Sequence, residues 1–335
     1  MLTSSAVSLR TLGCIVVVSM VVSGCNRATT HTSSETNSGK RDRYLVIFSQ
    51  CNNAEPYRAA QNELMTKLWT EKPDVDFEVT DAQQDNSKQI AQIETAILRD
   101  PALLIVAPNE RGPLTEVMGK AMAAGIKVIC LERDILKPNF TTFIGSDNRK
   151  IGRQAGQFIV DYLVEKNGSA KGHLVHMRGL LGVEGEINRH GGAQEIIEQH
   201  PEIKIVKDPV ADWLQSRARE RMTEVLSVET DIDVVYGHND PMAIGAYLAA
   251  KEVGREKEMI FIGIDALGGP AGGIRKVMDG VLAASFVYPL CVEEAVEIGD
   301  RILHEPDFAP KEKYEVMSQL ITLDNAADHY GTQAE

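Results

Sequence analysis

Polar and aromatic side chains follow several short apolar runs of this sequence, at the points where the runs end. They are rich in carboxylates, amides and arginines and nearly free of serine and cysteine nucleophiles. Carboxylates and amides accept and donate hydrogen bonds in pairs, and arginine presents a planar fork, so together they can satisfy the vicinal hydroxyls of a sugar. The set predicts sugar binding without covalent chemistry. Its members are Gln50, Asn53, Glu55, Tyr57, Arg58, Asn109, Glu132, Arg133, Arg189, Trp213, Asn239 and Asp265.

Each of these residue types also has a structural interpretation. An Asn or Asp after a strand is commonly the N-cap of the next helix. An arginine can belong to a surface ion pair, and a tryptophan can fill a core. These interpretations apply to Asn109, Asn148 and Asp240 as caps, to Arg133 and Arg189 as ion-pair residues, and to Trp213 as a core residue. The joint occurrence of these residues at strand ends favours the ligand site.

The elements that must position these residues alternate in type along the chain. Short β-branched runs predict strands, and the longer segments between them carry apolar residues at helical spacing. This alternation predicts an α/β fold with doubly wound parallel sheets covered by helices on both faces. The predicted strands are Tyr44–Ser49, Val75–Thr80, Leu103–Ala107, Lys127–Leu131, Thr141–Gly145, His173–Met177, Ile203–Val206, Val234–Tyr236, Met259–Ile262 and Val281–Phe286. The predicted helices include Ser87–Arg99, Gly112–Ala124, Ile151–Glu165, Glu184–Gln199, Leu214–Val228 and Pro241–Val253.

The length of 335 residues suits two domains of about 150 residues each. The domain change is expected near Gly145–Arg149, where a short strand ends in Gly145-Ser146-Asp147-Asn148. In open α/β sheets, ligands bind beyond the carboxyl ends of the strands. Two such domains facing each other therefore predict a cleft lined by the residues that follow the strands.

Composition and motifs exclude several classes of function. The net charge of −13 gives no positive field for nucleic acid. The sequence contains no GxGxxG, GxxxxGK[ST], HExxH or GxSxG motif, which argues against an enzyme. Cys51, Cys130 and Cys291 lack CxxC spacing, so neither a disulfide framework nor a zinc site is indicated. Four of the eight histidines, His173, His176, His190 and His238, stand at unrelated positions in the sequence, and we expect structural roles and no metal site.

The first 43 residues differ from the rest of the chain. Arg10 precedes an apolar run, Thr11 to Val22, which is too short to span a bilayer and is typical of an export signal. Val22-Ser23-Gly24-Cys25 resembles the lipobox of bacterial lipoproteins, in which the cysteine is acylated and becomes the new N-terminus. We predict a signal peptide over 1–24, lipidation of Cys25 and a flexible tether over 25–43, which is poor in apolar residues. The alternative is a plain secretory signal with an incidental cysteine.

A set of short motifs occurs in order over nearly the whole predicted mature chain. The motifs are Phe48-Ser49-Gln50, Tyr57-Arg58-Ala59-Ala60, Leu131-Glu132-Arg133, Gly145-Ser146-Asp147-Asn148, Arg189-His190-Gly191-Gly192, Ala211-Asp212-Trp213, His238-Asn239-Asp240-Pro241-Met242-Ala243-Ile244-Gly245-Ala246 and Gly263-Ile264-Asp265. The ordered set resembles the sugar-binding proteins of ABC importers in the ribose- and galactofuranose-binding group, which share their fold with LacI-type regulators.

The resemblance implies the type I fold of periplasmic binding proteins, with two Rossmann-like lobes joined by three crossings. The expected N-terminal lobe comprises 44–146 plus about 288–310, and the expected C-terminal lobe comprises 147–287 plus about 311–335. By motif, the resemblance implies ligand contacts for Arg189, Asn239 and Asp265, with Trp213 against the sugar ring. In the first lobe it implies contacts for Gln50, Tyr57, Arg58 and Arg133, while Glu132 stands where the family has Asp, and Glu55 is displaced by one position.

The function that the resemblance implies is that of a substrate-binding lipoprotein of an ABC-type sugar importer in the bacterial cell envelope. It would bind a monosaccharide, deliver it to a permease in the cytoplasmic membrane, and act as a monomer without a cofactor. The sequence leaves open a receptor that reports ligand binding to a sensor kinase or chemoreceptor. A gene regulator of the same fold would need a helix-turn-helix at the N-terminus, where the export signal stands.

Overall fold

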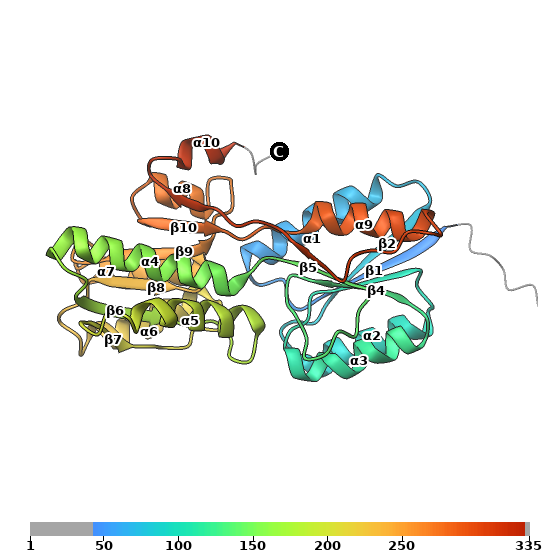
Figure 1. The fold of residues 1–335 in the computed structure, drawn as a ribbon, viewed down its shortest axis with the longest axis horizontal. Coiled ribbons are helices and arrows are strands. Elements are labelled where there is room, and N and C mark those ends of the chain that lie inside the picture. The colour runs from blue at the N-terminus through green and yellow to red at the C-terminus, as the bar shows by residue number, and fades with distance from the viewer. Residues whose placement is uncertain (1–42, 332–335) are drawn as a thin grey trace, which may run out of the picture. The chain divides into compact units, whose positions relative to one another are not determined.

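The computed structural model describes residues 43–331, which form two lobes, each built on a six-stranded sheet (Figure 1). The strand orders are β11-β5-β4-β3-β1-β2 and β12-β10-β9-β8-β6-β7. Every strand pair in the two sheets is parallel except the antiparallel pair β10–β12. The predicted doubly wound α/β class is confirmed.

The N-terminal lobe places helices on both faces of its sheet. Its strands are β1 (Tyr44–Gln50), β2 (Val75–Asp81), β3 (Leu103–Val106), β4 (Lys127–Leu131), β5 (Thr142–Gly145) and β11 (Lys313–Glu315). Its helices are α1 (Pro56–Thr70), α2 (Asn86–Leu98), α3 (Arg111–Ala123) and α9 (Val292–His304). One apolar cluster joins α1 and α9 to the sheet through Met65, Trp69 and Val296, and a second joins α2 and α3 through Ile93 and Met118. Burying both faces explains the continuous apolar runs of the central strands.

The C-terminal lobe repeats this plan with its own two apolar clusters. Its strands are β6 (Gly172–Met177), β7 (Ile203–Lys207), β8 (Val234–Gly237), β9 (Ile260–Asp265), β10 (Ala284–Val287) and β12 (Leu320–Thr322). Its helices are α4 (Asn148–Asn167), α5 (Glu184–Ile197), α6 (Gln215–Leu226), α7 (Asp240–Glu252), α8 (Gly273–Met278) and α10 (Ala326–Tyr330). Ile159 and Phe286 belong to one cluster, and Met222 and Phe261 belong to the other.

The described chain passes between the two sheets three times. The passages follow β5, β10 and β11, because β12 pairs with β10 in the second sheet while β11 pairs with β5 in the first. The expected boundary at about 311 is therefore too early, and the last passage begins after Glu315. The segment Lys313–Glu315 is a short edge strand with little buried surface, so no apolar run marks it in the sequence.

Local signals fix the helix starts that lie next to the passages and the strand ends. The Asp147 side chain accepts a hydrogen bond from the backbone N of Lys150 at 2.9 Å and caps α4. Asn239 caps α7 in the same way through the backbone N of Met242, and Pro241 occupies the first turn, where no donor is needed. These caps hold the carboxyl ends of the strands close to the helix starts that follow them.

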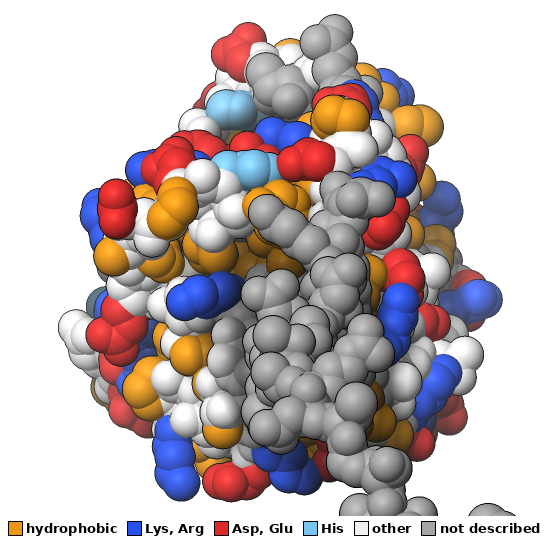
Figure 2. Space-filling model, turned by 90° about the vertical axis from the view of Figure 1, so that its right-hand side faces the viewer, with side chains coloured by type: hydrophobic (Ala, Val, Ile, Leu, Met, Phe, Trp, Pro, Cys, Tyr) orange, Lys and Arg blue, Asp and Glu red, His pale blue; other side chains and the backbone are white. Residues whose placement is uncertain are grey.

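The surface carries charges of both signs in close alternation. Figure 2 shows acidic and basic side chains interspersed over one face. Half-exposed ion pairs such as Arg99–Glu78 and Lys120–Glu94 are typical of this surface, and such pairs stabilise a fold by at most about 1 kcal/mol. Among residues 43–331, no helix combines the length and the apolar character that a membrane crossing requires.

Candidate ligand-binding cleft

A cleft lined by polar residues lies where the carboxyl ends of strands from both lobes meet, and its empty space of about 300 Å³ includes volume open to solvent. Most of the predicted ligand residues line it, and they come from both lobes. They are Glu55, Tyr57, Arg58, Glu132, Arg133, Arg189, Trp213, Asn239 and Asp265. Val183, Gly185 and Tyr288 complete the lining. Strand-end position in the sequence is therefore what identified the site.

Three of the lining residues have left-handed backbone conformations. Glu132 (φ 66°) follows β4, Asp265 (φ 133°) ends β9, and Trp213 (φ 70°) stands in the loop before α6. A non-glycine residue in this region costs on the order of 1–3 kcal/mol and persists only where its surroundings hold it. Gln83, Asp100, Ala266 and three other non-glycine residues share such a φ without lining the cleft, so this conformation is not confined to the site.

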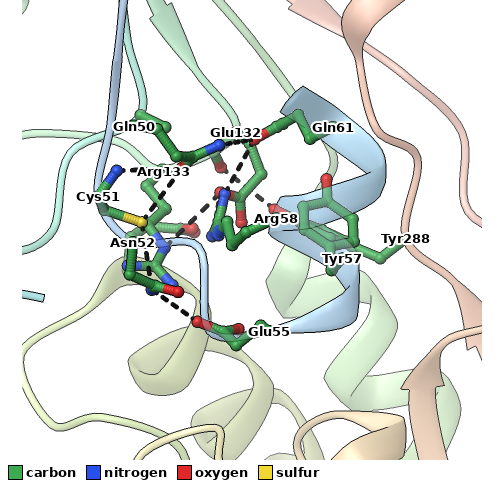
Figure 3. Close-up of polar contacts among 12 residues, drawn as sticks. Gln50, Cys51, Asn52, Glu55, Tyr57, Arg58, Gln61, Glu132, Arg133 and Tyr288 are labelled. Carbon is green, nitrogen blue, oxygen red and sulfur yellow. Dashed lines mark hydrogen bonds and ion pairs between the residues drawn. The ribbon is translucent and has the colours of Figure 1, made fainter. Parts of the chain in front are cut away.

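A buried ion pair between Arg58 and Glu132 forms the wall of the N-terminal lobe (Figure 3). Arg58 Nη2 lies 2.7 Å from Glu132 Oε2, and both side chains are almost fully buried. Burial by itself would raise the pKa of Glu132, but Arg58 and Arg133 lower it below its ordinary value. Gln61 Oε1 accepts a second hydrogen bond from Arg58 at 3.2 Å. The extra methylene of Glu relative to Asp thus serves to reach Arg58.

Arg189 and Tyr288 form the opposite wall. The Arg189 guanidinium carbon lies 4.3 Å from the centre of the Tyr288 ring, and Nη1 donates to the backbone O of His238 at 2.5 Å. Arg189 Nε donates to Asn148 Oδ1 at 2.8 Å. The Tyr288 hydroxyl donates to the backbone O of Glu132 at 3.1 Å, which ties the wall to the other lobe. These contacts fix the guanidinium plane before any ligand arrives.

Trp213 lies between two arginines that belong to different lobes. The guanidinium carbons of Arg133 and Arg189 lie 5.8 and 5.7 Å from the centre of its ring. Its Nε1 is buried and has no partner among the described residues, so it is a donor available to a ligand. Asn239 Nδ2 donates to the backbone O of Trp213 at 3.1 Å. Asn239 therefore acts both as the cap of α7 and as a support for the aromatic ring.

Asp265 presents the most available acceptor in the cleft. Its side chain is buried, and no described residue donates a hydrogen bond to it. Burial and the neighbouring Asp240 carboxyl raise the pKa of Asp265 well above its ordinary value, while Arg189 acts in the opposite direction. A buried carboxyl without a protein partner is costly unless a ligand supplies its hydrogen bonds.

Asp240 is a second buried carboxyl, close enough to Asp265 to interact with it electrostatically. Its two carboxyl oxygens accept hydrogen bonds from Ser285 Oγ at 2.6 Å and from the backbone N of Ala266 at 2.8 Å. A Cβ at Gly263 would lie 2.1 Å from Asp240 Oδ1, so glycine is required there. Asp240 is the first residue of α7 and its carboxyl is directed away from the cap position, which Asn239 fills.

The buried Asp240 carboxyl predicts a pH-dependent stability. Burial raises its pKa to about 6, above the value of 3.8 for an unfolded chain. The folded state then binds more protons than the unfolded state. The contribution of Asp240 to the free energy of unfolding is therefore fully present below pH 3.8 and is lost as the pH rises through about 6. We expect the free energy of unfolding of the ligand-free protein to lose about 3 kcal/mol from this group over that range.

Urea unfolding at several pH values, compared with Asp240→Asn, measures this effect. The amide can donate to Ser285 Oγ and accept from Ala266, as a protonated carboxyl does, so the variant should show the smaller pH slope. Parallel slopes in the two proteins would contradict the assignment.

Three predicted ligand residues do not line the cleft, and each of them has a hydrogen-bond partner in the protein. Gln50 is buried, and its Nε2 donates to Gln61 Oε1 at 2.9 Å. The same Gln61 oxygen also accepts a hydrogen bond from Arg58. Asn53 is exposed, and its Oδ1 accepts from Asn62 at 3.1 Å. Asn109 donates to Asn86 Oδ1 at 2.8 Å, and its backbone O accepts from Arg133 at 3.2 Å. Gln50 and Asn109 position arginines of the cleft, and spacing after a strand cannot separate such support from direct contact.

Tyr288 is the main lining residue that the sequence argument did not assign. It follows β10 (Ala284–Val287), so the strand-end rule that identified the other residues would have included it. Its ring also packs against Tyr57, with ring centres 5.5 Å apart, and the Tyr57 hydroxyl donates to the backbone O of Pro289 at 2.7 Å. The two tyrosines thus couple α1 to the second passage between the lobes.

Comparisons with known proteins agree with this architecture. The family model described as periplasmic binding protein domain matches residues 46–289. The chain is 30% identical to the galactofuranose-binding protein YtfQ of Escherichia coli (strain K12), over 72% of this chain and 76% of that protein. It is 26% identical to the ribose import binding protein RbsB of Bacillus subtilis (strain 168), over 85% of this chain and 90% of that protein.

A solved structure gives a similar result. The fructose-binding periplasmic domain of a hybrid two-component system is 34% identical, covers 86% of this chain and 93% of its own, and superposes with a TM-score of 0.81. The matched proteins are binding proteins and not enzymes. The match spans both lobes and the cleft between them, and the chain belongs to the periplasmic binding protein domain family.

Proposed function

We propose that this chain is the substrate-binding component of an ABC-type sugar importer and binds a monosaccharide in the cleft between its lobes. The observation that carries the proposal is the lining of the cleft. Trp213 Nε1 is buried without a partner among residues 43–331, the Asp265 carboxyl lines the cleft, and Arg58, Arg133 and Arg189 are held in place by other residues. Paired donors and acceptors around an aromatic face suit a molecule with vicinal hydroxyls. The names of two relatives state that they bind ribose or galactofuranose, which supports the same ligand class.

The mechanism is closure of two lobes on a ligand that contacts both. Arg58, Glu132 and Arg133 come from the N-terminal lobe, and Arg189, Trp213 and Asp265 come from the C-terminal lobe, so one small ligand bridges the two sheets. A ligand shifts the equilibrium between open and closed forms only through contacts that it makes in the closed form. The permease would then receive the closed, loaded protein.

Thermal unfolding against a ligand panel tests the proposal. The protein from Lys40 onward is heated with pentoses, hexoses, their furanose forms, polyols and inositols. A ligand present at 100 times its Kd adds ~2.7 kcal/mol to the free energy of unfolding, which raises the Tm by a few degrees for a protein of this size. We expect one sugar to give a selective rise. A cooperative transition that no member of the panel shifts would contradict sugar binding.

A second candidate function is a ligand-binding receptor that reports to a sensor kinase or chemoreceptor. The similarity to the fructose-binding domain of a hybrid two-component system favours it. Deletion of the gene separates the two functions. Loss of an importer component abolishes uptake of the labelled sugar, whereas loss of a receptor abolishes the transcriptional or chemotactic response and leaves uptake intact.

We further propose that Cys25 carries a lipid anchor. The cysteine lies outside the described residues, and the proposal rests on Val22-Ser23-Gly24-Cys25 after an apolar run. Two or more acyl chains give stable membrane attachment, since each buried CH₂ contributes ~0.8 kcal/mol. Cys25→Ala should release the protein into the soluble fraction of cell extracts, while Cys51→Ala should not. A Cys25→Ala protein that still sediments with membranes would refute the anchor.

A further inference from the structure

Three histidines that are far apart in the sequence meet inside the C-terminal lobe. His176 lies on β6, His190 on α5 and His238 directly after β8. His176 Nε2 and His238 Nε2 are 2.8 Å apart, and the rings of His176 and His190 stack with their centres 4.7 Å apart. One nitrogen of each ring lies within 4.8 Å of the others. The fold therefore brings together three histidines whose positions in the sequence are unrelated.

The hydrogen bonding of this histidine cluster is incomplete. His238 Nδ1 accepts from the backbone N of Gly179 at 3.3 Å, so in the neutral ring its proton is on Nε2 and is donated to His176 Nε2. His176 Nδ1 then carries a proton. His176 Nδ1 and His190 Nδ1 are both buried without a partner among the described residues. Leaving two polar atoms unsatisfied is costly, which indicates that the cluster serves something other than packing.

We propose that His176, His190 and His238 bind one Zn²⁺ ion. Zn²⁺ takes imidazole nitrogens at ~2.0–2.1 Å in tetrahedral geometry, which separates two ligand nitrogens by about 3.3 Å. The two Nε2 atoms, now at 2.8 Å, must move apart by about half an ångström. The proton between them moves to His238 Nδ1, and the hydrogen bond that this atom accepts from the backbone N of Gly179 is broken. No proton is lost in that rearrangement. The fourth position is left to water.

The surroundings of the cluster allow an ion to enter and to be held. His176 and His238 are buried, whereas His190 is only partly buried and provides access from solvent. The nearby Arg178 cation is compensated, because its Nη2 lies 2.6 Å from Glu186 Oε1.

A second group of possible ligands is unsuitable. His173, Asp231 and Asp233 also lie close together in this lobe. There, however, the Lys166 ammonium lies 2.6 Å from Asp233 Oδ1, and the backbone N of His173 donates to the other Asp233 oxygen at 2.8 Å. The carboxylate of Asp233 is already satisfied. His173 therefore provides a matched control for the histidine cluster.

The zinc site would support the cleft. The backbone O of His238 accepts from Arg189, and the ring centres of His238 and Trp213 are 6.4 Å apart. His190 and His238 directly adjoin Arg189 and Asn239 in sequence. An ion that fixes the three rings would fix the loops that carry these cleft residues, and would add stability to the C-terminal lobe.

The test uses protein without a histidine tag, stripped with EDTA and dialysed. Titration calorimetry with Zn²⁺ should show one ion per chain with a Kd in the micromolar range or tighter, and Zn²⁺ should raise the Tm. His190→Ala removes the partly buried ligand and should weaken Zn²⁺ binding at least 100-fold, while His173→Ala and His200→Ala should leave it unchanged. Co²⁺ bound to the unaltered protein should give the visible absorption of tetrahedral nitrogen coordination. This measurement needs no variant, so misfolding of a substituted protein cannot affect it.

Two results would overturn the proposal. One is the absence of stoichiometric Zn²⁺ binding together with the absence of the tetrahedral Co²⁺ spectrum. The other is unchanged binding in His190→Ala with loss of binding in His173→Ala, which would move the ion to the group around Asp233. Neither result bears on sugar binding, since the sugar panel is run with the metal-free protein as well.

Discussion

Asp265→Ala is expected to weaken binding of the sugar at least 100-fold while the protein stays folded. The side chain is buried in the cleft and accepts no hydrogen bond from a described residue, so its acceptors serve the ligand alone. A buried polar group that loses its hydrogen-bond partner costs ~1–3 kcal/mol, so two sugar hydroxyls left without Asp265 can reach the ~2.7 kcal/mol that corresponds to 100-fold. Titration calorimetry with the sugar that the thermal panel identifies measures the change.

The control for this prediction is Asp324→Ala, an exposed aspartate in the same lobe. It should bind with the affinity of the unaltered protein. Because burial raises the pKa of Asp265, its carboxyl is costly in the ligand-free fold, and Asp265→Ala should not lower the Tm. An Asp265→Ala protein with unchanged affinity would place the ligand elsewhere in the molecule.

Glu132→Ala should lower the free energy of unfolding by ~3–5 kcal/mol. The change leaves the Arg58 guanidinium buried without its counter-ion, and an uncompensated buried charge is far more costly than the loss of a surface pair. Arg58 Nε already lacks a partner among the described residues, so loss of Glu132 leaves the guanidinium with the neutral Gln61 Oε1 as its hydrogen-bond acceptor. Chemical denaturation followed by circular dichroism measures the loss.

Two comparisons make this prediction specific. The double variant Arg58→Met with Glu132→Met removes both charges and should recover much of the stability, since replacing a whole buried pair by apolar groups is often neutral. Glu94→Ala removes one partner of the exposed pair with Lys120 and should change stability by less than about 1 kcal/mol. Equal losses in the single and double variants would show that the ion pair does not cause the effect.

The sequence predicts the fold well because its signals are local and repeated. The strands Lys127–Leu131 and Tyr44–Gln50 contain the continuous apolar runs Val128–Leu131 and Leu45–Phe48, which are buried, and the helices between strands carry apolar residues at helical spacing. The edge strand Lys313–Glu315 has no such signal, because it has one partner strand and little buried surface. Its pairing with Phe143–Gly145 depends on a contact between segments far apart in the chain.

The cleft is predictable to the extent that strand ends converge. Asp265 ends β9 and Glu132 directly follows β4, and the topology of a parallel sheet brings such strand ends to one edge. The sequence does not distinguish a residue that faces the cleft from one that holds such a residue, as Gln50 and Asn109 do through Gln61 and Arg133. The meeting of the three histidines is likewise invisible in spacing, because it depends on β6, α5 and β8 packing together.

The most direct test of the cleft as the sugar site is the fluorescence of its tryptophan. The chain has two tryptophans, Trp213 in the cleft and Trp69 buried in the apolar cluster of the N-terminal lobe. Titration with the identified sugar should change the emission with the Kd found by calorimetry. The change should persist in Trp69→Phe and disappear in Trp213→Phe. A change that persists in Trp213→Phe at unchanged affinity and disappears in Trp69→Phe would contradict the placement of the sugar in the cleft.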